Sequence, residues 1–196
     1  MGLVGILERE MLHFKISRMD ELKNFLEGLL NSEFEDFYPL SGGASAEIYN
    51  IVLKNGKKLV LRRTPEKSES RLAIPKKIEA KVQKIVKKNE IPVPEIIEEF
   101  DESSGVGSGY IMEFVLGETI PRKILRDERF AQIRPNLALR IGEVLAKIHQ
   151  TDLSEIKELE KMTFYNSLNK LYEVYSSFNE PQPVFEYVFN LSLIHI

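Results

Sequence analysis

Apolar side chains recur with helical spacing in five segments of the chain. Within residues 19–30 they follow the i, i+3, i+4, i+7, i+8 spacing that places them on one face of an amphipathic helix. A second apolar stripe follows Pro75, a residue that the first turn of a helix tolerates, and lysines occupy the opposite face. Three more stripes lie in the second half of the chain. The predicted helices cover residues 19–30, 75–88, 135–149, 163–176 and 184–193.

Short apolar runs bounded by turn residues predict five β-strands, at residues 37–40, 48–53, 58–62, 95–100 and 110–115. Asn55-Gly56 separates the second run from the third and is a strong signal for a two-residue hairpin turn. One predicted helix lies between the third and fourth strands. The pattern therefore predicts an α+β protein, with an antiparallel five-stranded sheet crossed by one helix and a helical region after it.

Length and composition are consistent with two regions in one globular chain. The 196 residues are 43% hydrophobic and 29% charged, which supports a buried core and excludes a disordered chain. The character of the sequence changes near residues 116–119. We therefore expect residues 1–115 to hold the sheet and residues 116–196 to form the helical region.

Composition excludes several classes of protein. The chain has no Cys, which excludes disulfides, thiol catalysis and zinc bound by Cys. No apolar run approaches the ~18–20 residues that a membrane span needs, and residues 1–17 lack the charge order and apolar length of a signal peptide. We therefore expect a cytoplasmic protein that does not interact with membranes.

Charge is distributed unevenly along the chain. The formal net charge is −3, but residues 54–88 carry 13 Lys and Arg against three Glu, a net +10, so the rest carries −13. Such a region can attract an anionic ligand, although a solvated helix face is the simpler interpretation for most of its lysines. The segment has no aromatic residue on which a base could stack, so nucleic-acid binding is the weaker alternative. That alternative predicts salt-dependent binding that charge reversal at Lys77, Lys81 and Lys84 abolishes.

Four features suited to a phosphate-bearing ligand follow one another along the sequence. Gly42-Gly43 lies in a turn between two strands, where glycine lets backbone amides approach anionic oxygens. Arg62 ends the next strand with a planar fork of donors, and Glu79 in the following helix could pair with it. The strand at residues 110–115 then leads to a linker between the two regions, a usual place for a cleft. Singly, each feature has an ordinary structural explanation, and neither a P-loop nor a GxGxxG motif is present.

Five segments in this order resemble the aminoglycoside phosphotransferase (choline-kinase-like) family, in particular the branch associated with acyl-CoA dehydrogenases. They read SGGASAEIY at residues 41–49, LVLRRTP at 59–65, EA at 79–80, YIMEFVLG at 110–117 and LAKIHQTDL at 145–153. The likeness extends over about residues 22–190. It implies a protein-kinase-like fold, with an N-lobe that binds ATP with Mg²⁺ and the first helices of an incomplete α-helical C-lobe.

The resemblance also implies a role for each residue of a nucleotide site. Residues 41–46 would cover the phosphates. Arg62 stands where most relatives have a strand lysine that meets the α- and β-phosphates, a departure that keeps the charge but changes its geometry. Glu79 matches the helix acid that pairs with this cation. Glu113 and Val115 would offer their main-chain carbonyl and amide to adenine, and Ile48, Val60 and Met112 would form apolar walls around it. The implied site residues are Ser41, Gly42, Gly43, Ala44, Ser45, Ile48, Val60, Arg62, Glu79, Met112, Glu113, Phe114 and Val115.

The residues that perform phosphoryl transfer are not found in the sequence. The family places them in an H-x-D-x-x-x-x-N loop and a following metal-binding Asp. None of the five aspartates lies two residues after a His or five before an Asn. We therefore expect no catalytic or metal-ligating residue in this chain, a truncation before the catalytic loop, and a non-native sequence at residues 191–196.

Three functions remain open at this stage. The first is the ATP-binding part of a small-molecule kinase that phosphorylates a hydroxyl group, with aminoglycosides, choline, homoserine-like or hydroxyacyl compounds as acceptors and a weak preference for the last. The second is a non-catalytic, pseudokinase-like module that binds a nucleotide. The third and weakest is the nucleic-acid-binding domain. Nothing in the sequence indicates an oligomeric state.

Overall fold

The computed structural model describes residues 18–40, 46–65, 74–159 and 163–194. The described chain divides into two compact units, one ending at Ile156 and the other beginning at Lys157. The boundary between a sheet region and a helical region, predicted near residue 115, stays a prediction. Within the described residues, no helix combines the length and the apolar character needed to cross a membrane.

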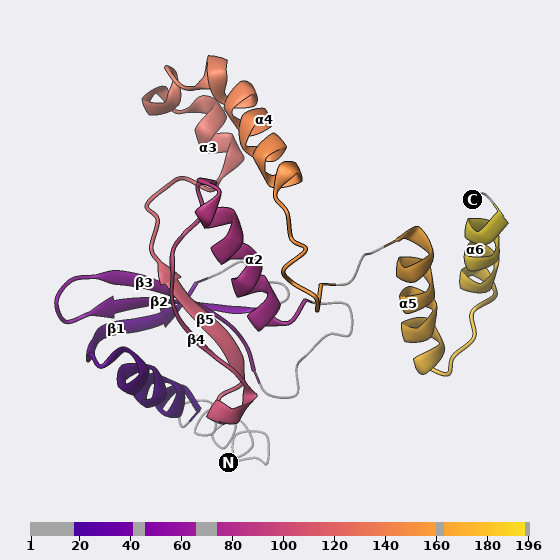
Figure 1. The fold of residues 1–196 in the computed structure, drawn as a ribbon, viewed down its shortest axis with the longest axis horizontal. Helices are drawn as coiled ribbons and strands as arrows, with labels where there is room; N and C mark the ends of the chain where they lie inside the picture. Colours follow the sequence, from indigo (N-terminus) through magenta and orange to yellow (C-terminus); the bar gives the residue numbers. More distant parts are fainter. Residues whose placement is uncertain (1–17, 41–45, 66–73, 160–162, 195–196) are drawn as a thin grey trace, which may run out of the picture. The chain divides into compact units, whose positions relative to one another are not determined.

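Five antiparallel strands form one sheet in the first unit, in the order β1-β2-β3-β5-β4 (Figure 1). This confirms the predicted α+β class and the five-stranded antiparallel sheet. The strand ends differ from the predicted ones by up to three residues, because pairing with a neighbour rather than hydropathy decides where a strand begins. The strands are β1 (Phe34–Pro39), β2 (Glu47–Leu53), β3 (Lys58–Thr64), β4 (Ile96–Phe100) and β5 (Ser108–Glu113).

One face of the sheet packs on the helix at residues 18–30. Leu22 and Leu26 of this helix are fully buried against the sheet, where they join a single apolar cluster. Side chains alternate between the two faces of a strand, so the strand residues of this cluster identify the face. They are Phe34 on β1, Tyr49, Ile51 and Leu53 on β2, Leu59 and Leu61 on β3, and Ile111 on β5.

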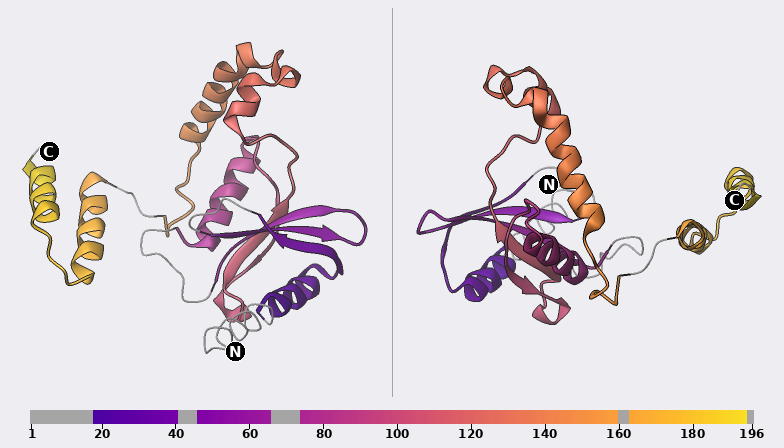
Figure 2. Two further views of the ribbon diagram at one scale, coloured as in Figure 1. Left: turned by 180° about the vertical axis from the view of Figure 1, so that it is seen from behind. Right: turned by 45° about the horizontal axis from the view of Figure 1, so that its top comes forward.

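The opposite face carries the helix α2 (Lys76–Lys88), which contacts β4 and β5. The two helices thus lie on opposite sides of the sheet (Figure 2). Pro75 is the residue immediately before α2, and its carbonyl accepts hydrogen bonds from the amides of Ile78 and Glu79 at 3.0 Å each. Ala80 and Val86 are the apolar residues that α2 buries, so the predicted crossing helix is confirmed.

The connection between β2 and β3 differs from the predicted two-residue turn. The amide of Gly56 donates to the Leu53 carbonyl at 2.8 Å, and the Leu53 amide donates to the Lys57 carbonyl at 2.9 Å. Gly56 has φ +81°, whereas a two-residue turn would also require positive φ at Asn55. The connection is therefore a longer hairpin loop with glycine in the left-handed position. Asn55 instead uses its side-chain oxygen to accept from the Lys57 amide at 3.0 Å.

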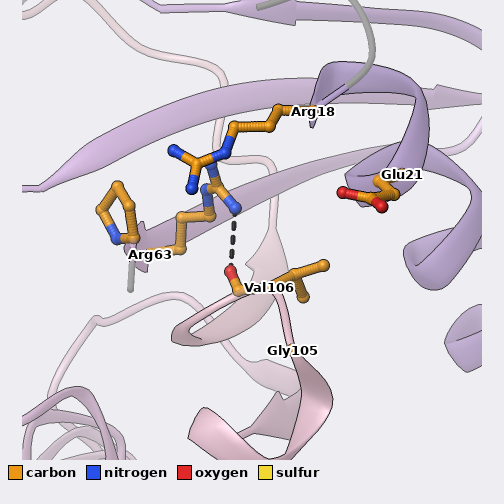
Figure 3. Close-up of a pocket in the computed structure, with 6 residues that line it drawn as sticks. Arg18, Glu21, Arg63, Gly105 and Val106 are labelled. Carbon is orange, nitrogen blue, oxygen red and sulfur yellow. Dashed lines mark hydrogen bonds between the residues drawn. The ribbon is translucent and has the colours of Figure 1, made fainter. Parts of the chain in front are cut away.

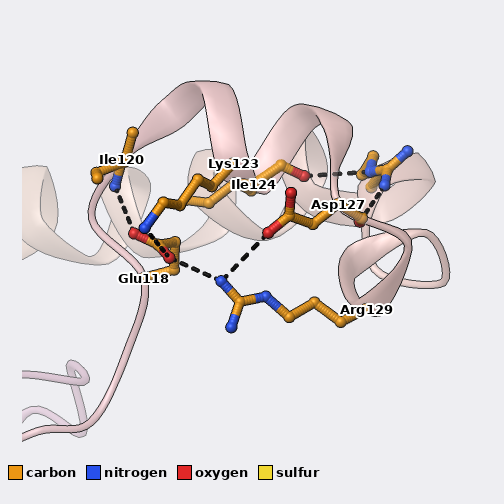
Figure 4. A network of polar contacts seen from close by, with 7 residues as sticks. Glu118, Ile120, Lys123, Ile124, Asp127 and Arg129 are labelled. Carbon is orange, nitrogen blue, oxygen red and sulfur yellow. Dashed lines mark hydrogen bonds and ion pairs between the residues drawn. The ribbon is translucent and has the colours of Figure 1, made fainter.

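Short elements that the hydropathy pattern did not predict surround a polar network after β5. They are α3 (Pro121–Arg126) and η2 (Glu128–Phe130), and the predicted helix α4 (Arg134–Gln150) follows them. Glu118 accepts from the Ile120 amide at 3.1 Å and forms an ion pair with Arg129 at 2.7 Å (Figure 4). These contacts organise the first turns of the helical region.

The second unit is a pair of helices, α5 (Phe164–Ser177) and α6 (Pro183–Ile194). Both were predicted. Thr163 caps α5 by accepting from the Asn166 amide at 3.1 Å. The rings of Tyr172 and Tyr175 face Phe189 with centroids 5.0 and 5.5 Å apart, so aromatic contacts hold the two helices together.

Candidate functional site

Arg62 and Glu79 meet on the α2 side of the sheet. Arg62 Nε donates to Glu79 Oε1 at 3.0 Å, and Arg62 Nη2 lies 3.0 Å from the same oxygen. The two side chains are 25% and 29% exposed, so the pair is partly shielded from water. The ion pair predicted from the sequence is therefore present, and it ties the first turn of α2 to β3.

Lys76 completes this cluster. Its Nζ lies 2.7 Å from Glu79 Oε2, and its side chain is only 5% exposed. Burial raises the pKa of Glu79, but the hydrogen bonds and charges of Lys76 and Arg62 outweigh burial and leave the pKa below its ordinary value. Glu79 is thus a carboxylate shared by two cations. In the sequence, Lys76 is one of the many cations of residues 54–88, and its i, i+3 spacing from Glu79 is the signal that identifies it as a partner.

Tyr110 lies beside this cluster, directly across from Arg62 on β5. It is 2% exposed. Burial and the charge of Glu79 raise the pKa of Tyr110 to about 12, although Arg62 opposes this effect. The phenol therefore remains neutral at physiological pH and contributes no negative charge to the cluster.

Apolar residues share the sheet face of Arg62. Ile48 on β2 is the cross-strand partner of Arg62, and Val60 on β3 pairs with Met112 on β5. Val60 is 8% exposed, while Ile48 and Met112 are half-buried. The structure thus brings Ile48, Val60 and Met112 to the sheet face of Arg62, and their role as walls for adenine stays a prediction.

A family model described as "Phosphotransferase enzyme family" matches residues 36–175. The chain belongs to this family. The match begins within β1 and ends within α5, and it includes the strands β2 to β5 and the Arg62–Glu79 pair. The search of curated proteins gave no match. A phosphotransferase-type function therefore rests on the family model, and the roles of single residues rest on the geometry.

The loop expected to cover the phosphates, Ser41-Gly42-Gly43-Ala44-Ser45, lies outside the described residues. Its two ends are described. The Leu40 amide donates to the Ile48 carbonyl at 2.8 Å, so the chain leaves β1 and returns to β2 at the same point of the sheet. Because Ile48 is the cross-strand neighbour of Arg62, both ends of the loop lie at the end of the sheet that holds Arg62.

The residues expected to meet adenine lie where β5 ends: Glu113 is its last residue, and Phe114 and Val115 follow. The Glu113 amide donates to the Glu95 carbonyl at 2.9 Å, and its carboxylate accepts from the Glu95 amide at 3.2 Å. Phe114 is half-buried, with Lys58 Nζ 5.9 Å from the centre of its ring. Val115 is 59% exposed. Glu113 is therefore held at the end of β5, between β3 and β4, and Val115, two residues later, is exposed to solvent.

Arg63, adjacent to Arg62 in the sequence, lies on the opposite face of the sheet. Its Nε donates to Glu47 Oε2 at 2.8 Å and its Nη1 donates to the Val106 carbonyl at 2.9 Å. It borders a cavity of about 40 Å³ that Arg18 and Glu21 also line (Figure 3). Arg63 already has a carboxylate and a carbonyl as partners, so it is a structural residue and a useful control for Arg62.

Carboxylates neutralise part of the basic segment. Lys54 pairs with Glu33, Lys84 pairs with Glu99, and Arg63 pairs with Glu47. All three acids lie outside residues 54–88 in the sequence. Tertiary contacts therefore reduce the excess of positive charge in this segment. Within the described part of the chain, no group of three or more His, Asp or Glu side chains could hold a metal ion.

Proposed function

We propose that this chain forms the ATP-binding part of a small-molecule phosphotransferase that transfers the γ-phosphate of ATP to a hydroxyl group. The observation that supports this function is the charged cluster of Arg62, Glu79 and Lys76 on the sheet face that also carries the apolar side chains of Ile48, Val60 and Met112. A triphosphate needs cations and a base needs apolar walls, and one face offers both.

The residues suit distinct parts of the nucleotide. Glu79 contacts Nε and Nη2 of Arg62 and so fixes the orientation of the guanidinium, whose remaining donors would meet phosphate oxygens. Gly42 and Gly43 would supply amides above the phosphates. The main-chain groups of Glu113 and Val115, with the ring of Phe114 between them, would meet the edge of adenine.

Transfer of the phosphate also requires a metal ion and acidic side chains, in addition to the residues of the nucleotide site. Mg²⁺, when bound, neutralises phosphate charge during such transfers, and the residues described offer no metal site. The H-x-D-x-x-x-x-N loop is not in the sequence. We therefore propose nucleotide binding for this chain, and transfer only where a C-lobe supplies the acidic residues. The likeness to the branch associated with acyl-CoA dehydrogenases supports a hydroxyacyl acceptor.

Isothermal titration calorimetry with Mg-ATP tests this function on the full chain. Arg62→Ala and Glu79→Gln should weaken binding about 10- to 100-fold, because a hydrogen bond to a charged group contributes ~1.5–3 kcal/mol. Arg63→Gln removes a guanidinium from the same strand but from the reverse face and should leave the affinity unchanged. A wild-type chain that binds no Mg-ATP at millimolar concentration would refute the proposal.

A further inference from the structure

Lys76 occupies a position that is unfavourable for a cation by two criteria. It is 5% exposed, and lysine is almost never buried without a partner that neutralises it. It is also the first residue of α2, where the positive end of the helix dipole disfavours a positive charge. A nearby negative charge would compensate both for the burial of Lys76 and for its place at the start of α2.

The carboxylate of Glu79 compensates for only one charge. Its Oε2 contacts Lys76 and its Oε1 contacts Arg62, so two cations share one anion. The neighbouring Tyr110 is neutral, since its pKa is raised to about 12. Counting the described residues alone, Arg62, Lys76 and Glu79 carry a net charge of +1 in partly buried surroundings, which is costly unless an anion binds there.

The geometry shows what Lys76 changes for Arg62. Both Arg62 contacts go to the single oxygen Oε1, because Lys76 occupies the other oxygen of Glu79. Without Lys76, both oxygens would be free for the two-oxygen, fork-to-fork pair that arginine prefers with a carboxylate. Such a pair would neutralise the guanidinium and leave the cluster with no net charge.

We propose that Lys76 is a positioning residue for the triphosphate, which holds Glu79 Oε2 so that Arg62 and the surplus positive charge of the cluster are directed to phosphate oxygens. This inference rests on the proposed function and adds to it. The preference for a nucleotide with several phosphates is then due to Lys76, although Lys76 is itself buried. The phosphate tail, and not the base, is the part of the ligand whose binding depends on Lys76.

Calorimetric titrations of ATP, ADP, AMP and adenosine, each with Mg²⁺, separate this role from a structural one. The wild-type affinity should rise with the number of phosphates. Lys76→Met should lower the ATP affinity about tenfold, as expected for the loss of one unit charge several ångströms away, and should change the adenosine affinity less than about twofold. Lys76→Arg should restore most of the ATP affinity. Lys77→Met, which removes the adjacent exposed lysine, should behave like the wild type.

The outcomes distinguish the inference from the function on which it rests. A wild-type chain that binds neither ATP nor adenosine overturns both. A Lys76→Met variant that keeps the full dependence on phosphate number overturns the role of Lys76 alone, as does an equal loss of ATP and adenosine binding. If circular dichroism shows that Lys76→Met is unfolded, Lys76→Gln, which keeps a hydrogen-bond donor without the charge, takes its place in the same comparison.

Discussion

At the scale of single residues, Asn50 is an exception to the rule that buried polar groups are paired. It is 1% exposed, and neither its Nδ2 nor its Oδ1 has a hydrogen-bond partner. Strand alternation places it on the Arg62 face, where it is the cross-strand neighbour of Val60. Leaving a buried amide without a partner costs about 1–3 kcal/mol.

Asn50→Leu should therefore raise the free energy of unfolding, by about 1–2 kcal/mol, because it replaces an unpaired amide with an apolar group of comparable size. Urea denaturation followed by circular dichroism measures the change. Asn50→Asp is the matched control and should destabilise the protein, since it buries a charge at the same place. A less stable Asn50→Leu would show that the amide is satisfied in solution.

Gly109 tests how closely β5 approaches its neighbours. A Cβ at this position would lie 2.8 Å from the Arg62 carbonyl oxygen and 2.8 Å from the Phe100 ring. Gly109→Ala should therefore destabilise the sheet by about 1–3 kcal/mol. Gly28→Ala is the control, because nothing lies within 4 Å of its added Cβ and alanine in a helix gains about 0.5–1 kcal/mol over glycine. Equal effects of the two substitutions in urea denaturation would contradict this packing.

At the scale of elements, the attachment of α2 to β3 depends on an ionised Glu79. Burial raises the pKa of Glu79, but Lys76 and Arg62 lower it more strongly, so in the folded chain it lies below the ordinary value of 4.5. When the pKa of a carboxyl group is lower in the folded chain than in the unfolded chain, its ionised form stabilises the fold at pH values above the unfolded pKa. This stabilisation is lost as the pH falls through the folded pKa.

The difference in stability between the wild type and Glu79→Gln should accordingly be largest above about pH 5 and shrink as the pH falls below 4.5. Urea midpoints measured from pH 3 to pH 7 give this difference directly, and comparison with the variant removes the contributions of other carboxylates. A difference that is the same at all these pH values would mean that Glu79 is not ionised in the folded chain or that its partners do not stabilise it.

At the scale of the whole molecule, the described apolar side chains that remain exposed lie mostly after residue 115. On α4 they include Ile141, Leu145 and Ile148, which are 58%, 48% and 44% exposed. Contiguous exposed apolar surface of this kind promotes association. The core between the sheet and the helix at residues 18–30, by contrast, is fully buried.

The full chain should therefore self-associate as its concentration rises, and sedimentation velocity detects this as an increase in the weight-average sedimentation coefficient. The double substitution Ile141→Lys and Leu145→Lys should reduce the association without lowering the melting temperature, because neither side chain belongs to the buried core. The exposed Lys147→Gln serves as the control on the same helix. A monomer at all concentrations would contradict this prediction.

Most elements could be predicted because their signals are local. Strand and helix periodicity identified all five strands and the helices α2, α4, α5 and α6, with errors of a few residues at their ends. α3 and η2 have six and three residues, too few for a period of 3.6 to become visible. The hairpin prediction was wrong in length because the hydrogen bonds of Leu53, and not the Asn55-Gly56 pair alone, decide the turn.

The candidate site was predictable only in part. The sequence by itself determined that an antiparallel sheet crossed by one helix precedes a helical region, that the cations are concentrated in residues 54–88, and that Arg62 and Glu79 are suitable partners. Only the tertiary structure decided that Lys76 joins them, that Arg63 serves the other face and that Asn50 is buried without a partner. Hydropathy and charge are properties of a residue and its near neighbours, whereas these facts depend on which strands lie side by side and which face α2 covers.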